Sequence, residues 1–175
     1  EAMLIAAATA QSTVDAGFKL PEPPVRPNLS GIADNMRATL YWDDIAEYSL
    51  DETNGNYDFE GYRLYSSNDD GINWTKLADY DLPNSIGENT GLQYSYTDTT
   101  IINGFEYWYS ITSYDRGDSL VESLECPLGT NTEAINLVSL VPRSDAIGRT
   151  PVSVAETQHI GAGESNYVLN IEPID

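Results

Sequence analysis

The residues best suited to hold a ligand lie in one acidic stretch between residues 43 and 60. It carries the carboxylates of Asp43, Asp44, Glu47, Asp51, Glu52, Asp58 and Glu60, with Asn54 and Asn56 as neutral oxygen donors. Calcium takes about six to eight hard oxygen ligands from such loops. A calcium site built from Asp43, Asp44, Asp51 and Asp58 is therefore one prediction. A solvated acidic loop without metal is the alternative, because the position of Gly55 and the acidic spacing do not fit an EF-hand.

Residues for nucleophilic chemistry are scarce. The chain has one cysteine, Cys126, and one histidine, His159, far apart in the sequence. A lone cysteine excludes an intrachain disulfide and multi-cysteine metal sites, and a lone histidine excludes multi-histidine sites. A Gly-x-Ser-x-Gly nucleophile motif is missing. Carboxylate pairs abound, but none stands out by context, so we expect no enzymatic activity and no cofactor other than calcium.

One short motif predicts a local structure. Ser67, Asp69, Gly71 and Trp74 fit the Asp-box pattern of sialidase propeller blades. A propeller needs several copies at a regular period, and this chain has one. We therefore expect a braced hairpin, in which Ser and Asp side chains fix the turn, Gly supplies a positive φ and Trp packs beneath.

Four short patterns mark where sugar would attach. Asn28 and Asn73 begin N-glycan sequons. The triplets 98–100 (Asp-Thr-Thr) and 118–120 (Asp-Ser-Leu) resemble bacterial O-glycosylation sites. Three-residue patterns recur by chance, so the sequence indicates positions rather than a modification.

The charge of the chain limits its partners. Twenty-eight acidic and eight basic residues give a net charge of -20 and a pI near 4.1. Such a surface repels phosphate backbones and anionic lipid, so nucleic-acid binding is not expected. The longest apolar stretch, residues 3–10, is too short to span a membrane, so no membrane insertion is expected.

Local patterns divide the chain into four parts, residues 1–20, 21–29, 30–128 and 129–175. Residues 1–20 read as a short helix that stops near Gly17, and residues 21–29 as an extended proline-rich linker. Residues 30–128 contain alternating segments separated by turns, typical of an all-β sandwich. The expected strands are 37–42, 59–65, 72–77, 93–97, 105–114 and 120–126.

The runs TLYWD, GYRLY and YWYSITSYDRG resemble a fibronectin type III domain. In that family a Trp on the second strand packs over a Tyr-x-hydrophobic pair on the third, and Trp42, Tyr62 and Leu64 match these places. The family's tyrosine corner matches Tyr107, whose hydroxyl the resemblance ties to the preceding loop. The other inward positions of that strand are Tyr109, Ile111 and Ser113. The resemblance implies an immunoglobulin-like sandwich, of the kind found in large multidomain bacterial surface or secreted proteins.

Residues 129–175 carry three further strand patterns, at 134–141, 151–155 and 166–171. Three strands in this length cannot close a sandwich alone. They either add to the first domain or belong to a partial β domain or strand-exchanging extension, and we favour the second. An open sheet edge would then be completed by more chain or by a neighbouring subunit.

The expected function is a non-catalytic structural or assembly module of an extracellular or cell-surface bacterial protein: a filament, sheath, adhesin or layer component. Its expected partners are copies of itself or neighbouring domains of the same parent protein, because both ends of the chain look cut from a larger one. The alternative is an accessory spacer or carbohydrate-binding module of a secreted hydrolase. Exposed aromatic residues on the long strand, Trp108 and Tyr114, would then bind glycan.

Overall fold

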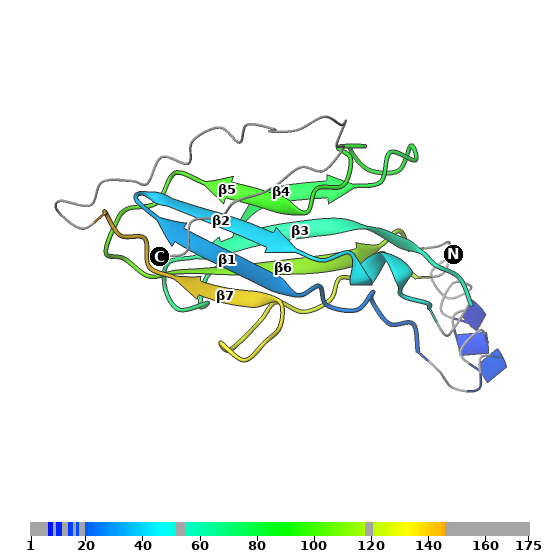
Figure 1. The fold of residues 1–175 in the computed structure, drawn as a ribbon. Helices are drawn as coiled ribbons and strands as arrows, with labels where there is room; N and C mark the ends of the chain where they lie inside the picture. The colour runs from blue at the N-terminus through cyan, green and yellow to red at the C-terminus, as the bar shows by residue number, and fades with distance from the viewer. Residues whose placement is uncertain are drawn as a thin grey trace, which may run out of the picture. The chain divides into compact units, whose positions relative to one another are not determined.

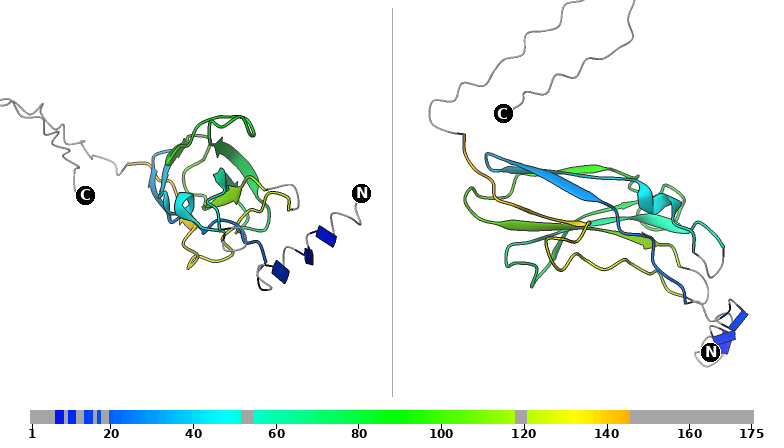
Figure 2. Two further views of the ribbon diagram at one scale, coloured as in Figure 1. Left: turned by 90° about the vertical axis from the view of Figure 1, so that its right-hand side faces the viewer. Right: turned by 60° about the horizontal axis from the view of Figure 1, so that its bottom comes forward.

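The computed structural model describes residues 20–51, 55–117 and 121–145, together with residues 7, 8, 10, 11, 14, 15 and 17. The described chain forms seven strands and one short 3-10 helix: β1 (Leu29–Asp34), β2 (Arg37–Trp42), η1 (Ile45–Tyr48), β3 (Phe59–Ser67), β4 (Thr75–Asp81), β5 (Ser95–Asp98), β6 (Tyr107–Asp115) and β7 (Leu137–Leu140). The strands form two antiparallel sheets, with orders β1-β2-β5 and β4-β3-β6-β7 (Figure 1). Figure 2 shows the two sheets facing each other in two further views.

The core lies between the two sheets, where alternation along each strand places one apolar face. Trp42, Tyr62, Leu64 and Ile111 are buried in one cluster, and Tyr107 packs against it at the edge. The ring centres of Trp42 and Tyr62 are 6.3 Å apart in an edge-to-face contact. Burying side chains of this size stabilises the fold by about 2 kcal/mol each. The sequence predicted inward positions or fibronectin-like core places for all five, and the structure confirms that they meet in one core.

A β-bulge at Glu60 changes which residues of β3 face the core. Phe59 pairs with Asp115 and Gly61 with Tyr114, so Glu60 is an extra residue between two registers. Strict alternation from Tyr62 would turn Glu60 inward. The bulge instead brings Phe59 into the core cluster, and Glu60 lines a pocket outside it.

The proline-rich segment is docked on the domain. Pro24 and Pro27 are buried, and the hydroxyl of Ser113 donates hydrogen bonds to the carbonyl oxygens of Pro24 (3.1 Å) and Val25 (2.8 Å). The strand β1 that follows was not among the expected strands. The domain therefore begins before residue 30, because the segment predicted as an extended proline-rich linker at 21–29 packs on the sandwich at these residues.

The domain also extends past the expected boundary at residue 128. β7 pairs with β6 from Leu137 to Leu140, so the first of the three C-terminal strand patterns completes the four-stranded sheet. The strand expected at 120–126 is reduced, among its described residues, to one bridge between Tyr114 and Glu125. Residues 127–135 leave the sheet between these two pairings, as the yellow loop beside β7 in Figure 1.

Asn136 joins the two ends of the loop at 127–135. Its side-chain amide donates to the carbonyl oxygens of Ile111 (2.9 Å) and Pro127 (3.1 Å). Its backbone carbonyl accepts from Ile111 N–H at 3.0 Å, which restores the ladder ahead of β7. The strands expected at 151–155 and 166–171 lie outside the described residues.

The described positions of the N-terminal segment agree with the expected helix. Residues 7, 8, 10, 11, 14 and 15 are helical, and Gly17 has φ +71° with its N–H donating to the Val14 carbonyl at 3.0 Å. A left-handed glycine is a common helix end. Within the described residues we find no helix of the length and apolar character that a membrane crossing requires.

Candidate functional site

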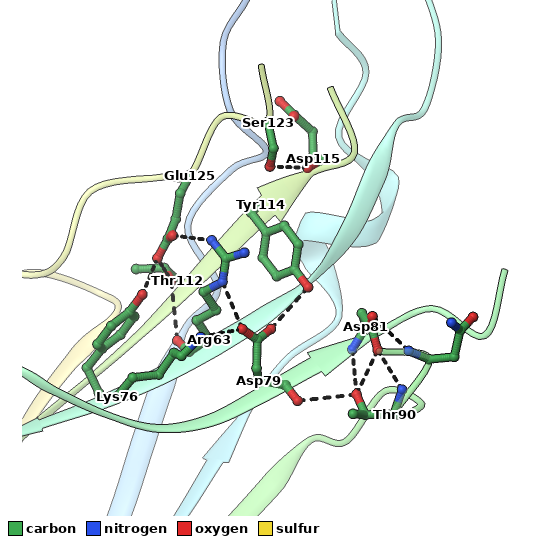
Figure 3. Close-up of polar contacts among 12 residues, drawn as sticks. Arg63, Lys76, Asp79, Asp81, Thr90, Thr112, Tyr114, Asp115, Ser123 and Glu125 are labelled. Carbon is green, nitrogen blue, oxygen red and sulfur yellow. Dashed lines mark hydrogen bonds and ion pairs between the residues drawn. The ribbon is translucent and has the colours of Figure 1, made fainter. Parts of the chain in front are cut away.

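The outer face of the four-stranded sheet carries a polar cluster centred on Arg63, shown in Figure 3. Arg63 lies between the inward residues Tyr62 and Leu64, so alternation turns it outward. Its cross-strand neighbours are Asp79 on β4 and Thr112 on β6. The cluster, here called the Arg63 network, comprises Arg63, Tyr65, Lys76, Asp79, Thr112, Tyr114 and Glu125.

Arg63 joins two carboxylates from different segments. Its Nε donates to Asp79 Oδ2 at 3.1 Å, and its Nη1 donates to Glu125 Oε2 at 2.5 Å. The guanidinium carbon lies 3.8 Å from the centre of the Tyr114 ring, within cation–π range. The Tyr114 hydroxyl donates to Asp79 Oδ1 at 3.1 Å, which locks the ring below the guanidinium.

The pKa shifts in the Arg63 network keep its groups in one protonation state. Burial opposes ionisation of Asp79, but hydrogen bonds from Lys76 and Arg63 hold its pKa below the ordinary value. Burial and the neighbouring Asp79 raise the pKa of the Tyr114 hydroxyl, and burial and Glu125 raise that of Tyr65. With these shifts, Asp79 stays ionised and Tyr65 and Tyr114 stay protonated near neutral pH. The Arg63 network therefore has a structural role.

An acidic pocket of about 260 Å³ lies beside the Arg63 network. It is lined by Glu60, Arg63, Asp79, Asp81, Ile86, Gly87, Glu88, Tyr114, Asp115, Arg116 and Ser123. Three of these carboxylates, Glu60, Asp81 and Asp115, are at most 5% exposed.

Two of the buried carboxylates in the acidic pocket are committed to the backbone. Asp81 accepts from Thr90 N–H (2.6 Å) and Asn89 N–H (3.0 Å), and these bonds lower its pKa against the effect of burial. Asp115 Oδ1 accepts from the N–H groups of Gly117 and Leu124, both at 2.9 Å. Its pKa is nevertheless raised, chiefly by burial.

Glu60 is different because one of its oxygens is buried without a hydrogen-bond partner among the described residues. This oxygen is Oε1, while Oε2 accepts from the Asn84 side chain at 2.9 Å. Burial raises the pKa of Glu60, and the bond from Asn84 lowers it by less. Among the buried side-chain oxygen and nitrogen atoms of the described pocket residues, Glu60 Oε1 is the one without a hydrogen-bond partner.

The four residues predicted to bind calcium lie in different settings. Asp43 accepts from the backbone N–H of Asn28 at 3.0 Å and from its side-chain amide, which ties the start of β1 to the end of β2. Asp44 precedes η1 and accepts from the Tyr48 hydroxyl at 3.5 Å. Asp51 bridges to Asn56, and the carbonyl of Asp58 accepts from Arg116 N–H at 3.1 Å.

Across residues 20–51, 55–117 and 121–145, we find no group of three or more acidic, histidine or cysteine side chains arranged to hold a metal ion. The calcium site stays a prediction, and three residues of its loop (52–54) lie outside the described ranges.

The structure corrects one of the two residues predicted to bind glycan. Tyr114 is on the outer face of β6, as alternation requires, but it is 7% exposed and held by Arg63 and Asp79. A sugar cannot stack on that ring. Trp108 is partly exposed, and its Nε1 donates to Glu106 at 3.3 Å.

Cys126 is buried, and burial raises the pKa of its thiol. Its Sγ accepts from the backbone N–H of Ser113 at 3.3 Å. A reactive cysteine needs an accessible thiolate, so this environment suits an inert core residue. His159 lies outside the described residues.

The single Asp-box motif forms the expected braced hairpin between β3 and β4. Ser67 Oγ accepts from Gly71 N–H at 3.0 Å, and Asp69 Oδ1 accepts from Asn73 N–H at 2.9 Å. Gly71 has φ +78°, and Trp74 lies against it.

Sequence reasoning missed both the Arg63 network and the acidic pocket. The available signals were an arginine in the middle of an apolar strand pattern and a Glu-Gly pair at the strand's start, which marks a bulge. The partner carboxylates come from residues 79–81 and 115–125, which no local pattern joins to residue 63.

No protein-family model and no curated protein matches the chain. Solved structures resemble it at low identity. A fibronectin type III-like protein from Clostridium thermocellum is 17% identical, with 73% of this chain and 100% of that one covered and a TM-score of 0.42. A β-1,2-glucanase from Parabacteroides distasonis is 21% identical over 73% of this chain, with a TM-score of 0.42, and the match spans only 14% of the glucanase. The fourth fibronectin type III domain of a human protein is 12% identical, covering 75% and 88% of the two chains, also with a TM-score of 0.42.

The fold assignment rests on the domain's own architecture. A three-stranded and a four-stranded antiparallel sheet enclose Trp42, Tyr62 and Leu64, and the hydroxyl of Tyr107 bonds back to the loop before β6. The described residues form a fibronectin type III-like β-sandwich.

Proposed function

We propose that the chain is a non-catalytic structural module of an extracellular or cell-surface bacterial protein, and that it contacts copies of itself or neighbouring domains of its parent protein. One observation carries the proposal: three exposed apolar side chains at one end of the sandwich, here called the end patch. The end patch consists of Met36, Ile102 and Phe105, which are 53%, 57% and 62% exposed.

Hydrogen bonds hold the end patch in shape. The side-chain oxygen of Asn103 accepts from Met36 N–H at 2.8 Å, and its amide donates to Asn35 at 2.7 Å. These bonds join the β1–β2 turn to the loop before β6. Exposed apolar side chains that are held at one end of a domain of this charge favour a protein contact there.

The chain also passes beside the end patch after β7. The carbonyl of Pro142 accepts a hydrogen bond from Gly104 N–H at 2.9 Å, next to Phe105. A module or second copy that contacts this end of the domain would therefore meet apolar side chains. Such a position supports contacts along a chain or between copies.

The polar groups on the outer sheet face support a role without catalysis. Paired carboxylates with pKa values pushed apart can serve as acid and base. Asp81, whose pKa is lowered, already accepts backbone and Thr90 hydrogen bonds on both oxygens, so it is poorly placed to attack or deprotonate a substrate. The Arg63 network is likewise committed to internal bonds.

Sedimentation velocity and electron microscopy over a range of protein concentrations test the proposal. We expect concentration-dependent association that is lost in the double variant Ile102→Ser, Phe105→Ser. The matched control is Ile45→Ser, Tyr57→Ser, which removes two apolar side chains, 48% and 64% exposed, outside the end patch. A chain that stays monomeric throughout, or equal loss of association in both double variants, would contradict self-assembly through the end patch.

A further inference from the structure

The acidic pocket contains a buried hydrogen-bond acceptor that the domain itself does not use. Glu60 is 2% exposed, and its Oε1 has no hydrogen-bond partner among the described residues. A buried carboxylate oxygen without a donor is strongly unfavourable. The β-bulge places Glu60 here rather than in the core, so the geometry of β3 produces this acceptor.

The lining of the acidic pocket has an excess of negative charge. Its five carboxylates are Glu60, Asp79, Asp81, Glu88 and Asp115, against the guanidinium groups of Arg63 and Arg116. Arg63 is already bound to Asp79 and to Glu125, which is not among the lining residues. A pocket with this balance attracts a cation.

The donor set does not suit a metal ion. Asp81 uses both oxygens for hydrogen bonds with Thr90 and Asn89, and Asp115 Oδ1 binds two N–H groups. Calcium would need about six or more oxygens. Within the described ranges, no group of three metal-ligating side chains is present.

A single free oxygen also discriminates between organic cations. A guanidinium binds a carboxylate best through two parallel bonds, but Asn84 already occupies Oε2 of Glu60. A primary ammonium is a point charge that needs only one strong acceptor here. Ile86 also lines the pocket and offers apolar surface for an alkyl stem.

We propose that the acidic pocket binds a primary ammonium group on an aliphatic stem, with Glu60 Oε1 as its principal acceptor. A lysine side chain of a partner protein has this chemistry, as does a free amine such as an amino sugar. The proposal is independent of the end patch, because it concerns another surface of the domain.

Arg116 is a built-in competitor for this site. It lines the acidic pocket, and its positive charge acts on Glu60. Removing that charge makes the pocket more negative without removing the acceptor. The variant Arg116→Gln should therefore bind an ammonium more tightly than the wild type.

The probe is Nα-acetyl-lysine methylamide, titrated into the isotopically labelled full chain and followed by NMR chemical shifts of residues around the pocket. The neutral analogue Nα-acetyl-norleucine methylamide has nearly the same stem without the ammonium. We expect saturable shifts with the lysine probe only. Glu60→Gln should weaken binding by about tenfold or more, because it removes a charged acceptor.

The control Glu133→Gln removes the same charge from an exposed site outside the acidic pocket and should bind as the wild type does. If Glu60→Gln does not fold, tighter binding by Arg116→Gln still supports the site. Equal binding by wild type and Arg116→Gln would overturn it in that case.

A parallel titration with glucosamine distinguishes the two sources of the ammonium. Shifts with the lysine probe alone support a protein partner, and shifts with glucosamine alone support an amino sugar. Shifts with both support the shared chemistry. Absence of saturable shifts with either probe, or equal shifts with the norleucine analogue, would overturn the proposal.

Discussion

The hydroxyl of Tyr107 accepts a hydrogen bond from the backbone N–H of Ile102, with 3.1 Å between oxygen and nitrogen. This bond joins the start of β6 to the loop that precedes it and holds that loop beside the sandwich. The same loop carries two residues of the end patch. A side chain at the edge of the core thus positions an exposed surface.

Tyr107→Phe should lower the free energy of unfolding by about 1 kcal/mol, because one hydrogen bond is lost while the ring stays packed. The measurement is urea denaturation followed by fluorescence. Tyr57→Phe removes a hydroxyl from a residue that is 64% exposed and should change stability little. Equal effects of the two substitutions would show that the Tyr107–Ile102 bond adds nothing.

This tyrosine corner was predictable because the family resemblance fixes its place on a long, strongly patterned strand. β2 was predicted with the bounds that the structure has, and β3, β5 and β6 within a few residues, for the same reason. Their apolar positions alternate clearly, and turn residues flank them. The core residues on these strands follow from the same alternation.

The less accurate predictions concern edges and irregularities. β1 follows a proline-rich stretch and was not among the expected strands, and no sequence pattern indicated that Pro24 and Pro27 of that stretch are buried. β7 is separated from Glu125 by an excursion, so its membership in the sheet depends on pairing with β6, a contact that alternation cannot encode. The bulge at Glu60 changes which side chains at the start of β3 face the core. The alternation in the sequence therefore did not indicate the acidic pocket.

Gly61→Ala should destabilise the domain by about 3 kcal/mol, because a new methyl group would overpack β3. A Cβ on Gly61 would lie 2.2 Å from the Tyr80 carbonyl oxygen and 2.8 Å from the Tyr114 hydroxyl. The Tyr80 atom belongs to the backbone and cannot rotate away. Thermal and urea unfolding measure the loss.

Gly104→Ala is the matched control. Gly104 has φ +88°, but a Cβ there meets nothing within 4 Å, so only backbone strain of about 1 kcal/mol is expected. If Gly61→Ala is no worse than Gly104→Ala, the close approach of β4 to β3 is not as tight as the structure has it.

Asp69 should make stability depend on pH at the acid end. Hydrogen bonds from the Asn73 side chain and backbone lower its pKa from 3.8 to about 2. A carboxyl whose pKa falls on folding stabilises the fold above its unfolded pKa, and this contribution disappears as pH falls through the folded pKa. The stability difference between wild type and Asp69→Asn should therefore shrink between about pH 4 and pH 2.

The measurement is urea unfolding at several pH values, with NMR titration of the Asp69 carboxyl. Asp70→Asn removes the neighbouring exposed charge and serves as the control. A difference between wild type and Asp69→Asn that stays constant over this range would mean that Asp69 is not held by the hairpin.

Metal removal tests the calcium prediction. If the loop at 43–58 binds calcium, EDTA at constant NaCl should lower the melting temperature by several degrees, and excess CaCl2 should restore it. Constant NaCl keeps the screening of the net charge of -20 unchanged. The double variant Asp51→Asn, Asp58→Asn should lose the response to EDTA. Identical melting curves of the wild type with EDTA and with CaCl2 would exclude a stabilising calcium ion.

Arg63→Met should destabilise the domain by about 2 kcal/mol. Asp79 and Glu125 would keep their negative charges but lose the arginine, and they are too poorly hydrated for water to compensate fully. The side chains of the three residues are only 26–30% exposed, so solvent screens them incompletely. Arg37→Met breaks the ion pair with Asp34, in which the side chains are 51% and 45% exposed, and should cost at most about 0.5 kcal/mol.

Adding Glu125→Gln to Arg63→Met separates the two contributions of the arginine. If the loss comes from an unpaired carboxylate, the second substitution should recover part of the stability, since it removes the carboxylate that loses its ion pair with Arg63, whereas Asp79 keeps Lys76. If the loss comes from packing of the guanidinium on Tyr114, the second substitution should recover nothing. Equal costs for Arg63→Met and Arg37→Met would contradict both, and would place the Arg63 network among ordinary surface ion pairs.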